Sequence, residues 1–127
     1  MSYGSSVRAD LREPTRELRR AIPQVYEGYK QLYDGALAPG VLDVKAKELI
    51  ALALAVSKGC DGCIAAHAHA AVHHGATPQE AAEAIGVAIL MNGGPGTVYG
   101  PRAYAAVREF YENRGVELLR VEHTGHV

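Results

Sequence analysis

The chain has 127 residues, of which 48% are apolar and 21% charged, so it can form one globular core and is too apolar to be disordered. Thirteen Lys and Arg face fourteen Asp and Glu, a net charge of −1 that offers no basic surface for nucleic acid or for an acidic membrane. The polar N-terminal segment lacks the apolar stretch of a signal peptide. The longest apolar runs have eight residues, against the roughly twenty that span a bilayer. We therefore expect one cytoplasmic domain over residues 1–127.

The spacing of apolar residues is helical throughout, with proline and glycine between the segments. Pro23 suits the first turn of a helix, Asp43 is a candidate N-cap, and the segment 77–80 (Thr-Pro-Gln-Glu) has the pattern of a capping box. Gly115 is expected to end the last helix. The helices are predicted approximately over residues 9–20, 23–36, 44–58, 60–75, 78–92 and 98–114. No segment alternates with a period of two, so the predicted fold is an all-α bundle of about six helices.

Two of these helices, 44–58 and 78–92, carry apolar residues on nearly every face. The second half of 44–58 is predicted to be buried all round. So short a chain cannot cover that much apolar surface with one core, and we therefore expect a homo-oligomer. The run Arg16, Glu17, Arg19 and Arg20, by contrast, is interpreted as an ordinary solvated helix face.

The cysteines carry the first chemical signal, because both lie at the predicted start of one helix with His67 beyond them. At 100° per residue, Cys63 lies about 60° and His67 about 20° from Cys60, so all three share a face. The two sulfurs are close enough to form a disulfide. A helix N-terminus and a histidine both favour a thiolate, which makes this a candidate redox pair.

Glu48 is the second signal, since a carboxylate in a helix predicted to be buried must be paired, protonated or functional. His67 on the neighbouring helix is its expected partner. Carboxylate, imidazole and thiol would then form a chain in which a base is oriented by a third group. A structural salt bridge to Lys or Arg is the alternative for Glu48.

Other interpretations of the cysteines remain open. They could be two small buried side chains. A zinc site could combine Cys60, Cys63 and His67 with either Glu48 or His74, although structural zinc sites usually take two well-separated ligand pairs. We expect no metal and no cofactor. His74 shares the face of Cys60, and both His74 and Tyr99 are candidates to line the same pocket.

Glu48, eleven intervening residues and then Cys60-x-x-Cys63-x-x-x-His67 resemble the active-site motif of the alkyl hydroperoxidase D-like branch of the carboxymuconolactone decarboxylase family. The segment 92–102 resembles the turn that follows the helical core in small members. The resemblance covers residues 40–110 and implies a homo-oligomer, often a trimer or hexamer. It departs at one place: the best-known members have a histidine where this chain has Gly62.

The resemblance implies a peroxidase that reduces hydrogen peroxide or organic hydroperoxides. Cys63 would attack the peroxide, Cys60 would resolve the sulfenic acid into a disulfide, and Glu48 with His67 would relay the proton. A lipoyl- or thioredoxin-type dithiol would be the reductant. Two other functions remain as hypotheses: a decarboxylase or isomerase acting on a small carboxylated ring through His67 and Glu48, and a non-catalytic redox-sensing or metal-binding helical oligomer.

Overall fold

The computed structural model describes the backbone of residues 2–124 and the side chains of residues 2–115. This part of the chain contains six helices and no strand. They are α1 (Tyr3–Ala21), α2 (Pro23–Leu37), α3 (Val44–Lys58), α4 (Asp61–His73), α5 (Pro78–Asn92) and α6 (Gly94–Thr124). The prediction of an all-α fold with six helices is therefore confirmed.

Side-chain caps fix the helix starts that the sequence located best. The Asp43 carboxylate accepts a hydrogen bond from the backbone N–H of Ala46 at 2.8 Å, at the start of α3. At the start of α5, Thr77 and Glu80 form a capping box: the threonine hydroxyl accepts from one backbone N–H and the glutamate from the other. Each cap satisfies amides that have no partner inside the helix.

The first and last helices are longer than predicted. α1 begins at Tyr3 and passes through Pro14, and α6 begins at Gly94 and passes through both Pro101 and Gly115. A proline removes one helical hydrogen bond, which these two helices tolerate. Gly115 does not end α6. Among the described residues, the glycines with positive φ are Gly59, Gly75 and Gly93, so Gly115 keeps a negative φ. A helix ends at glycine when that residue turns left-handed, and Gly115 does not.

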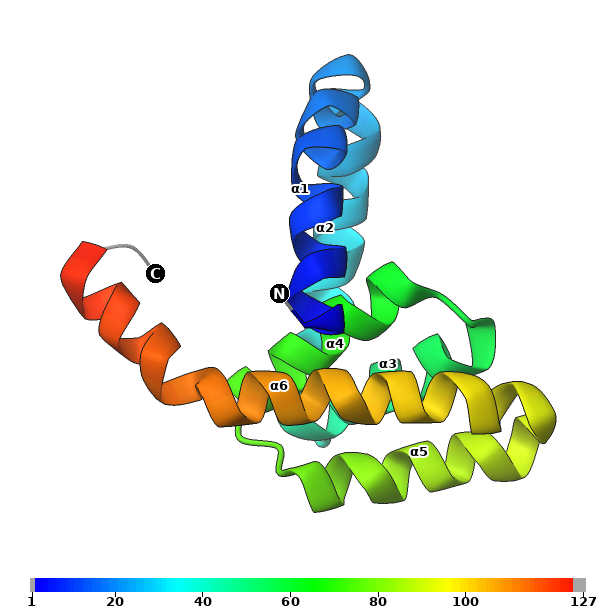
Figure 1. Cartoon of the computed structure of the whole chain (residues 1–127). Helices are drawn as coiled ribbons and strands as arrows, with labels where there is room; N and C mark the ends of the chain where they lie inside the picture. Colours follow the sequence, from blue (N-terminus) through cyan, green and yellow to red (C-terminus); the bar gives the residue numbers. More distant parts are fainter. Residues whose placement is uncertain (1, 125–127) are drawn as a thin grey trace.

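Helices α3 to α6 pack into one block that holds the core. Figure 1 shows α5 and α6 lying side by side beneath α3 and α4. Leu52, Val56, Ile64 and Val107, one or two from each of α3, α4 and α6, are fully buried at its centre. Alanines fill much of the remaining interface, which lets the helix backbones approach closely.

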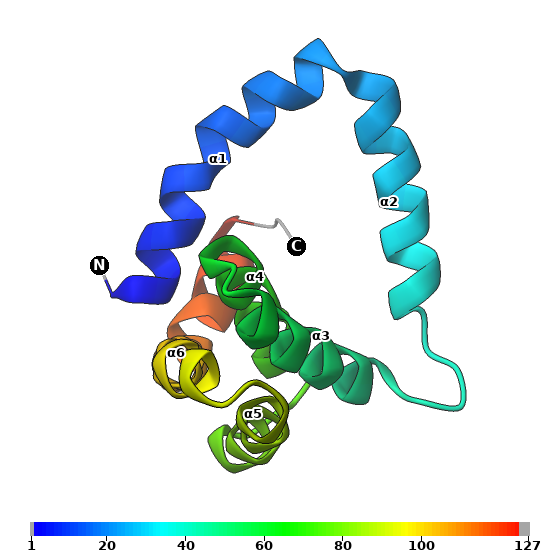
Figure 2. The same cartoon turned by 90° about the vertical axis from the view of Figure 1, so that its right-hand side faces the viewer.

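The other two helices form a hairpin that stands away from this block. α1 packs on α4 and α6 along its first half, whereas α2 meets its neighbours only sparsely. Figure 2 shows the hairpin as an open arch above α4. No residue of α2 is buried, and Val25, Tyr29 and Leu32 are each more than half exposed. The apolar side of α2 therefore has no cover among the described residues.

The prediction that the second half of α3 is buried all round is wrong for the single chain. Leu52 and Val56 face the core, but Ile50 is 48% and Leu54 57% exposed. α3 packs mainly on α4, α5 and α6 and only sparsely on α2, and these neighbours leave Ile50 and Leu54 uncovered. α5 likewise exposes its apolar residues Val87, Leu90 and Met91. Among the described residues, no helix combines the length and hydropathy required to cross a lipid bilayer.

Candidate active site

The site begins at the corner between α3 and α4, which Gly59 forms. Its backbone is left-handed, with φ at 65°, and its N–H bonds back to the carbonyls of Ala55 and Val56. A side chain here would be strained, and its Cβ would also lie 2.9 Å from the ring of Tyr99. Glycine thus lets the chain reverse tightly and start α4 with its N-terminus beside α6.

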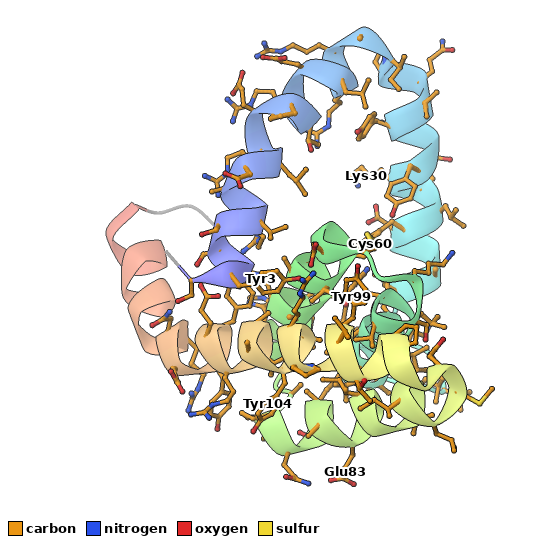
Figure 3. All side chains as sticks on the ribbon, turned by 45° about the vertical axis from the view of Figure 1, so that its right-hand side comes forward. Tyr3, Lys30, Cys60, Glu83, Tyr99 and Tyr104 are labelled. Carbon is orange, nitrogen blue, oxygen red and sulfur yellow. A yellow bond between two sulfur atoms is a disulfide. The ribbon has the colours of Figure 1, made fainter. Side chains whose placement is uncertain are left out.

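Cys60 and Cys63 are joined by a disulfide at this N-terminus, with their Cα atoms 5.3 Å apart. Cys60 is the N-cap of α4, and its sulfur accepts the backbone N–H of Cys63 at 3.2 Å. Cys63 is exposed and Cys60 is half-buried. Figure 3 shows Cys60 at the end of α4 that faces the space between α1 and α2. The pair is therefore open to reactants and lies in the positive field of a helix N-terminus.

Glu48 and His67 meet as the sequence predicted. Oε2 of Glu48 lies 2.7 Å from Nδ1 of His67, and the glutamate is 2% exposed. An ionised carboxylate only accepts, so the imidazole donates from Nδ1 and its Nε2 is left for proton exchange. His67 follows Cys63 by one helical turn on the same face of α4. The structure thus joins the four predicted residues in two pairs, one through the disulfide and the other through this hydrogen bond.

Tyr33 of α2 is a site residue that the sequence did not reveal. Its ring stacks on the ring of His67, with centroids 6.2 Å apart and planes inclined by 16°. Burial raises the pKa of Tyr33, and the negative charge of Glu48 raises it further. No spacing rule connects a tyrosine in one helix to a histidine 34 positions later. Only the closure of the hairpin onto the block brings the two rings together.

The sequence also did not reveal the residues that contact Asp61. Asp61 is the first residue of α4 and lies between the two cysteines in the sequence. It accepts a hydrogen bond from the Tyr3 hydroxyl and lies 3.5 Å from Arg102 Nη1. Arg102 in turn lies over the Tyr99 ring, 5.1 Å from its centroid. Burial of Tyr3 and its bond to Asp61 raise the pKa of Tyr3. These contacts offset the charge of Asp61 beside the sulfurs and place Tyr99 against the corner, as the sequence had suggested.

His74 does not belong to the site. It is the C-cap of α4 and is exposed, with its ring against that of His73. At 1.5 Å per residue, the fourteen positions from Cys60 to His74 correspond to about 21 Å along the helix. Angular position alone had suggested a shared pocket, and the axial distance overturns it. Within the described residues, no group of three or more His, Cys, Asp or Glu side chains is placed to hold a metal ion.

Comparison with known proteins assigns the chain to a family. The sequence profile of the carboxymuconolactone decarboxylase family matches residues 23–109. The chain therefore belongs to this family. An uncharacterized protein of Cupriavidus necator is 41% identical over 88 residues, which cover 69% of this chain and 78% of the relative. A protein of the cox locus of Paracoccus denitrificans is 34% identical over 93 residues, covering 73% and 84% respectively.

Solved structures agree with this assignment. A carboxymuconolactone decarboxylase family protein from Legionella pneumophila has a TM-score of 0.82 and 39% identity, over 85% of this chain and 96% of its own. A family member from Thermotoga maritima has a TM-score of 0.75 and 28% identity, over 88% and 95%. An involvement in the antioxidative response has been suggested for the Thermotoga protein.

Proposed function

We propose that this protein is a thiol-dependent peroxidase and disulfide oxidoreductase of the alkyl hydroperoxidase D-like type, which reduces hydrogen peroxide or organic hydroperoxides. One observation carries the proposal: a buried carboxylate orients an imidazole one helical turn beyond a redox pair at a helix N-terminus. If Glu48 and His67 formed only a structural salt bridge, the accessible cysteine pair one turn away would have no role in it. If the disulfide were only structural, the oriented imidazole beside it would have no role. The suggested antioxidative role of the Thermotoga relative supports the same class.

The catalytic cycle starts from the dithiol form. His67 takes the proton of Cys63 through Nε2, and Glu48 stabilises the resulting imidazolium. The Cys63 thiolate attacks one peroxide oxygen, so an S–O bond forms and the O–O bond breaks. The alcohol or water that leaves takes the proton back from His67. Two electrons have then passed from sulfur to peroxide, and Cys63 is a sulfenic acid.

Cys60 completes the oxidative half of the cycle. Its sulfur attacks the sulfenic sulfur of Cys63, the S–S bond forms, and water leaves. The Cα separation of 5.3 Å allows this bond without moving the backbone. An external dithiol, of the lipoyl or thioredoxin class, then reduces the disulfide by thiol–disulfide exchange. Tyr33 is a positioning residue in this scheme, since its ring holds the imidazole plane from the α2 side.

The direct test measures peroxide consumption by the reduced full-length protein, with dithiothreitol as reductant. The wild type should turn over, and Cys63→Ser should abolish turnover. Cys60→Ser, assayed after the dithiothreitol has been removed, should react once with peroxide, give a sulfenic acid that dimedone traps, and then stop. Unchanged turnover by Cys63→Ser, or activity that survives alkylation of both cysteines, would refute the proposal and favour acid–base chemistry. If one equivalent of peroxide oxidises the cysteine pair but no dithiol supports turnover, the result would favour a redox sensor over an enzyme.

A second test addresses the relay. In Glu48→Gln the imidazolium loses its buried counter-charge, so the pKa of the Cys63 thiol should rise and alkylation by iodoacetamide should require higher pH. Glu83→Gln is the matched control, because Glu83 is exposed on α5, on the side of the molecule away from Cys60 (Figure 3). Its alkylation profile should match that of the wild type. Coincident profiles for Glu48→Gln and Glu83→Gln would remove Glu48 from the mechanism.

We also propose that the protein is a homo-oligomer, as a trimer or hexamer. The uncovered apolar residues of α2, α3 and α5 supply the surface, which is more than a monomer normally exposes. Sedimentation velocity should show a multiple of 13.5 kDa. Leu32→Glu, which places a charge on the exposed side of α2, should shift this mass toward the monomer. A wild-type protein that sediments as a monomer at micromolar concentration would contradict the proposal.

A further inference from the structure

A groove of about 310 Å³ runs between α1 and α4 beside the redox pair. α1 contributes four arginines to its lining, and α4 contributes two small residues at its N-terminal end. These six residues are Arg8, Arg12, Arg16, Arg19, Gly62 and Ala66. Leu11 and Thr15 of α1 complete the wall. Four arginines therefore line one concavity whose lining contains no carboxylate.

The charges of α1 are segregated around its axis. At 100° per residue the four arginines of the groove fall within about 80° of one another. The acidic residues of the same helix, Asp10, Glu13 and Glu17, lie at least about 100° from the centre of that stripe. The sequence of residues 16–20 predicts an ordinary solvated face, because basic and acidic residues alternate there. That interpretation does not account for the separation of arginines and carboxylates onto different sides of the helix. The helix carries five arginines and three carboxylates, and four of the arginines lie on the side of the groove.

The positive charge of the groove is only partly offset. Arg16 lies 3.5 Å from Glu13, and both side chains are more than half exposed, which makes the pair weak. Arg8 and Arg19 lie over the rings of Phe110 and Tyr26 and keep their charge. Arg12 makes no hydrogen bond, ion pair or ring contact with the described residues. Such a concentration of guanidinium groups in a hollow attracts a carboxylate or phosphate and can bind it through two parallel N–H bonds.

The groove reaches the first turns of α4, where Cys63 lies. Gly62 immediately precedes Cys63, Ala66 follows it by three residues, and Cys63 itself is exposed. A Cβ on residue 62 would lie 2.9 Å from Cδ1 of Leu11. The end of the Leu11 side chain thus lies against the backbone of Gly62, where α1 meets the start of α4. An anion held by the arginines would extend toward this part of α4, with the aliphatic side chain of Leu11 along its path.

We propose that this groove is the substrate site for organic hydroperoxides that carry a carboxylate. The inference rests on the proposed peroxidase function and names the substrate class of that same site. The arginines would bind the carboxylate, with Arg12 as the principal anchor because its guanidinium is unoccupied. The aliphatic part of the molecule would lie along Leu11 and Thr15, and the peroxide group would reach Cys63. The reaction at sulfur is the one already described and needs no additional reactant.

The test compares two substrates that differ only in the charge, a hydroperoxy fatty acid and its methyl ester, both below their critical micelle concentrations. With wild-type protein the acid should have a KM about tenfold lower than the ester, the fold-change expected for one charge-assisted contact. Arg12→Ala should raise the KM of the acid about tenfold and bring the acid-to-ester ratio close to one. The KM of the acid for Arg12→Lys should lie between the values for wild type and Arg12→Ala, since lysine keeps the charge but lacks the planar guanidinium.

Arg20→Ala is the matched control, because Arg20 is an exposed arginine of α1 outside the groove lining. It changes the net charge by the same amount and should leave the acid-to-ester ratio at the wild-type value. Equal KM values for acid and ester in the wild type would overturn the proposal. An equal loss of preference in Arg20→Ala and Arg12→Ala would also overturn it, because it would mean a general charge effect without a site.

A binding measurement separates this inference from the proposed function. The hydroxy fatty acid is the redox-inert product analogue, and calorimetric titration should show it binding to the wild type about tenfold more tightly than its methyl ester. Arg12→Ala should remove that difference. If neither hydrogen peroxide nor an organic hydroperoxide is turned over but the hydroxy acid still binds through Arg12, the peroxidase proposal fails and the groove remains an anion site. If hydrogen peroxide is turned over and the hydroxy acid binds no better than its ester, only the groove proposal fails.

Discussion

The block of α3 to α6 and the hairpin of α1 and α2 use their apolar residues in opposite ways. In the block, Leu52 and Ile64 are fully buried among neighbouring helices. In the hairpin, Leu32 of α2 is 68% exposed, and α2 has no buried residue at all. Yet the hairpin supplies Tyr33 to the candidate site and lines the arginine groove. The comparison indicates that the block gives the fold its stability, whereas the hairpin serves the site and its partners.

The largest expected effect is in the core of the block. Leu52→Ala leaves a cavity among packed helices and should lower the free energy of unfolding by about 3 kcal/mol. Leu32→Ala is the matched change in the hairpin and should cost no more than about 0.5 kcal/mol for the dilute monomer. Urea unfolding followed by circular dichroism measures both. Equal losses would mean that the hairpin and the block share one core.

The next effect concerns the disulfide. Reducing Cys60–Cys63 opens a loop of only four residues, so the chain-entropy relation predicts a loss of about 2 kcal/mol in the free energy of unfolding. The double variant Cys60→Ser/Cys63→Ser should show the same stability with and without reductant. A loss well above this value would indicate that reduction also releases the contacts of the hairpin with the site.

A smaller effect is expected at the start of α5. Thr77→Ala removes the cap that accepts the backbone N–H of Glu80, and should lower the free energy of unfolding by about 1 kcal/mol. Thr97→Ala is the control, because the Thr97 hydroxyl donates to the carbonyl of Gly94 and satisfies no free helix amide. Thr97→Ala should cost less than Thr77→Ala. The reverse order would contradict the capping argument.

The smallest effect is that of the exposed ion pair between Lys45 of α3 and Glu80 of α5, at 2.8 Å. The hydrogen bond from Lys45 lowers the pKa of Glu80, so the pair stabilises the fold above the ordinary glutamate pKa of about 4.3 and loses this effect as pH falls through the lowered value. Lys45→Gln should therefore be less stable than wild type at pH 7 and closer to it at pH 3. Urea midpoints at the two pH values measure this. Lys58→Gln, the control on the same helix, should show no such convergence.

Most of the block could be predicted from the sequence, because its signals are local. Asp43 and the capping box at Thr77 fixed two helix starts, and the four-residue motif placed Glu48 against His67. The angular position of His74 around the helix predicted that it shares a pocket with Cys60, but its distance along the helix axis places it away from the site. Gly115 misled because a glycine ends a helix only when its backbone turns left-handed.

The contribution of the hairpin could not be predicted, since it depends on where a loosely packed element comes to rest. Tyr33 and Tyr3 carry no motif, and their roles follow from contacts with residues 34 and 58 positions away. The exposure of Ile50 and Leu54 is of the same kind, because an apolar helix face does not say which neighbour covers it. Local patterns identify what a helix can bury, and tertiary arrangement decides which side is buried.

The stacking of Tyr33 on His67 has a thermodynamic consequence. Tyr33 belongs to the helix least fixed by its own chain, so whatever holds α2 in place also sets the surroundings of the imidazole. If a second copy covers α2, subunit assembly and thiol ionisation are linked equilibria, and linkage is reciprocal. Dilution would then shift the thiol–thiolate equilibrium at the site, and ionisation of the thiol would alter the association constant by the same factor.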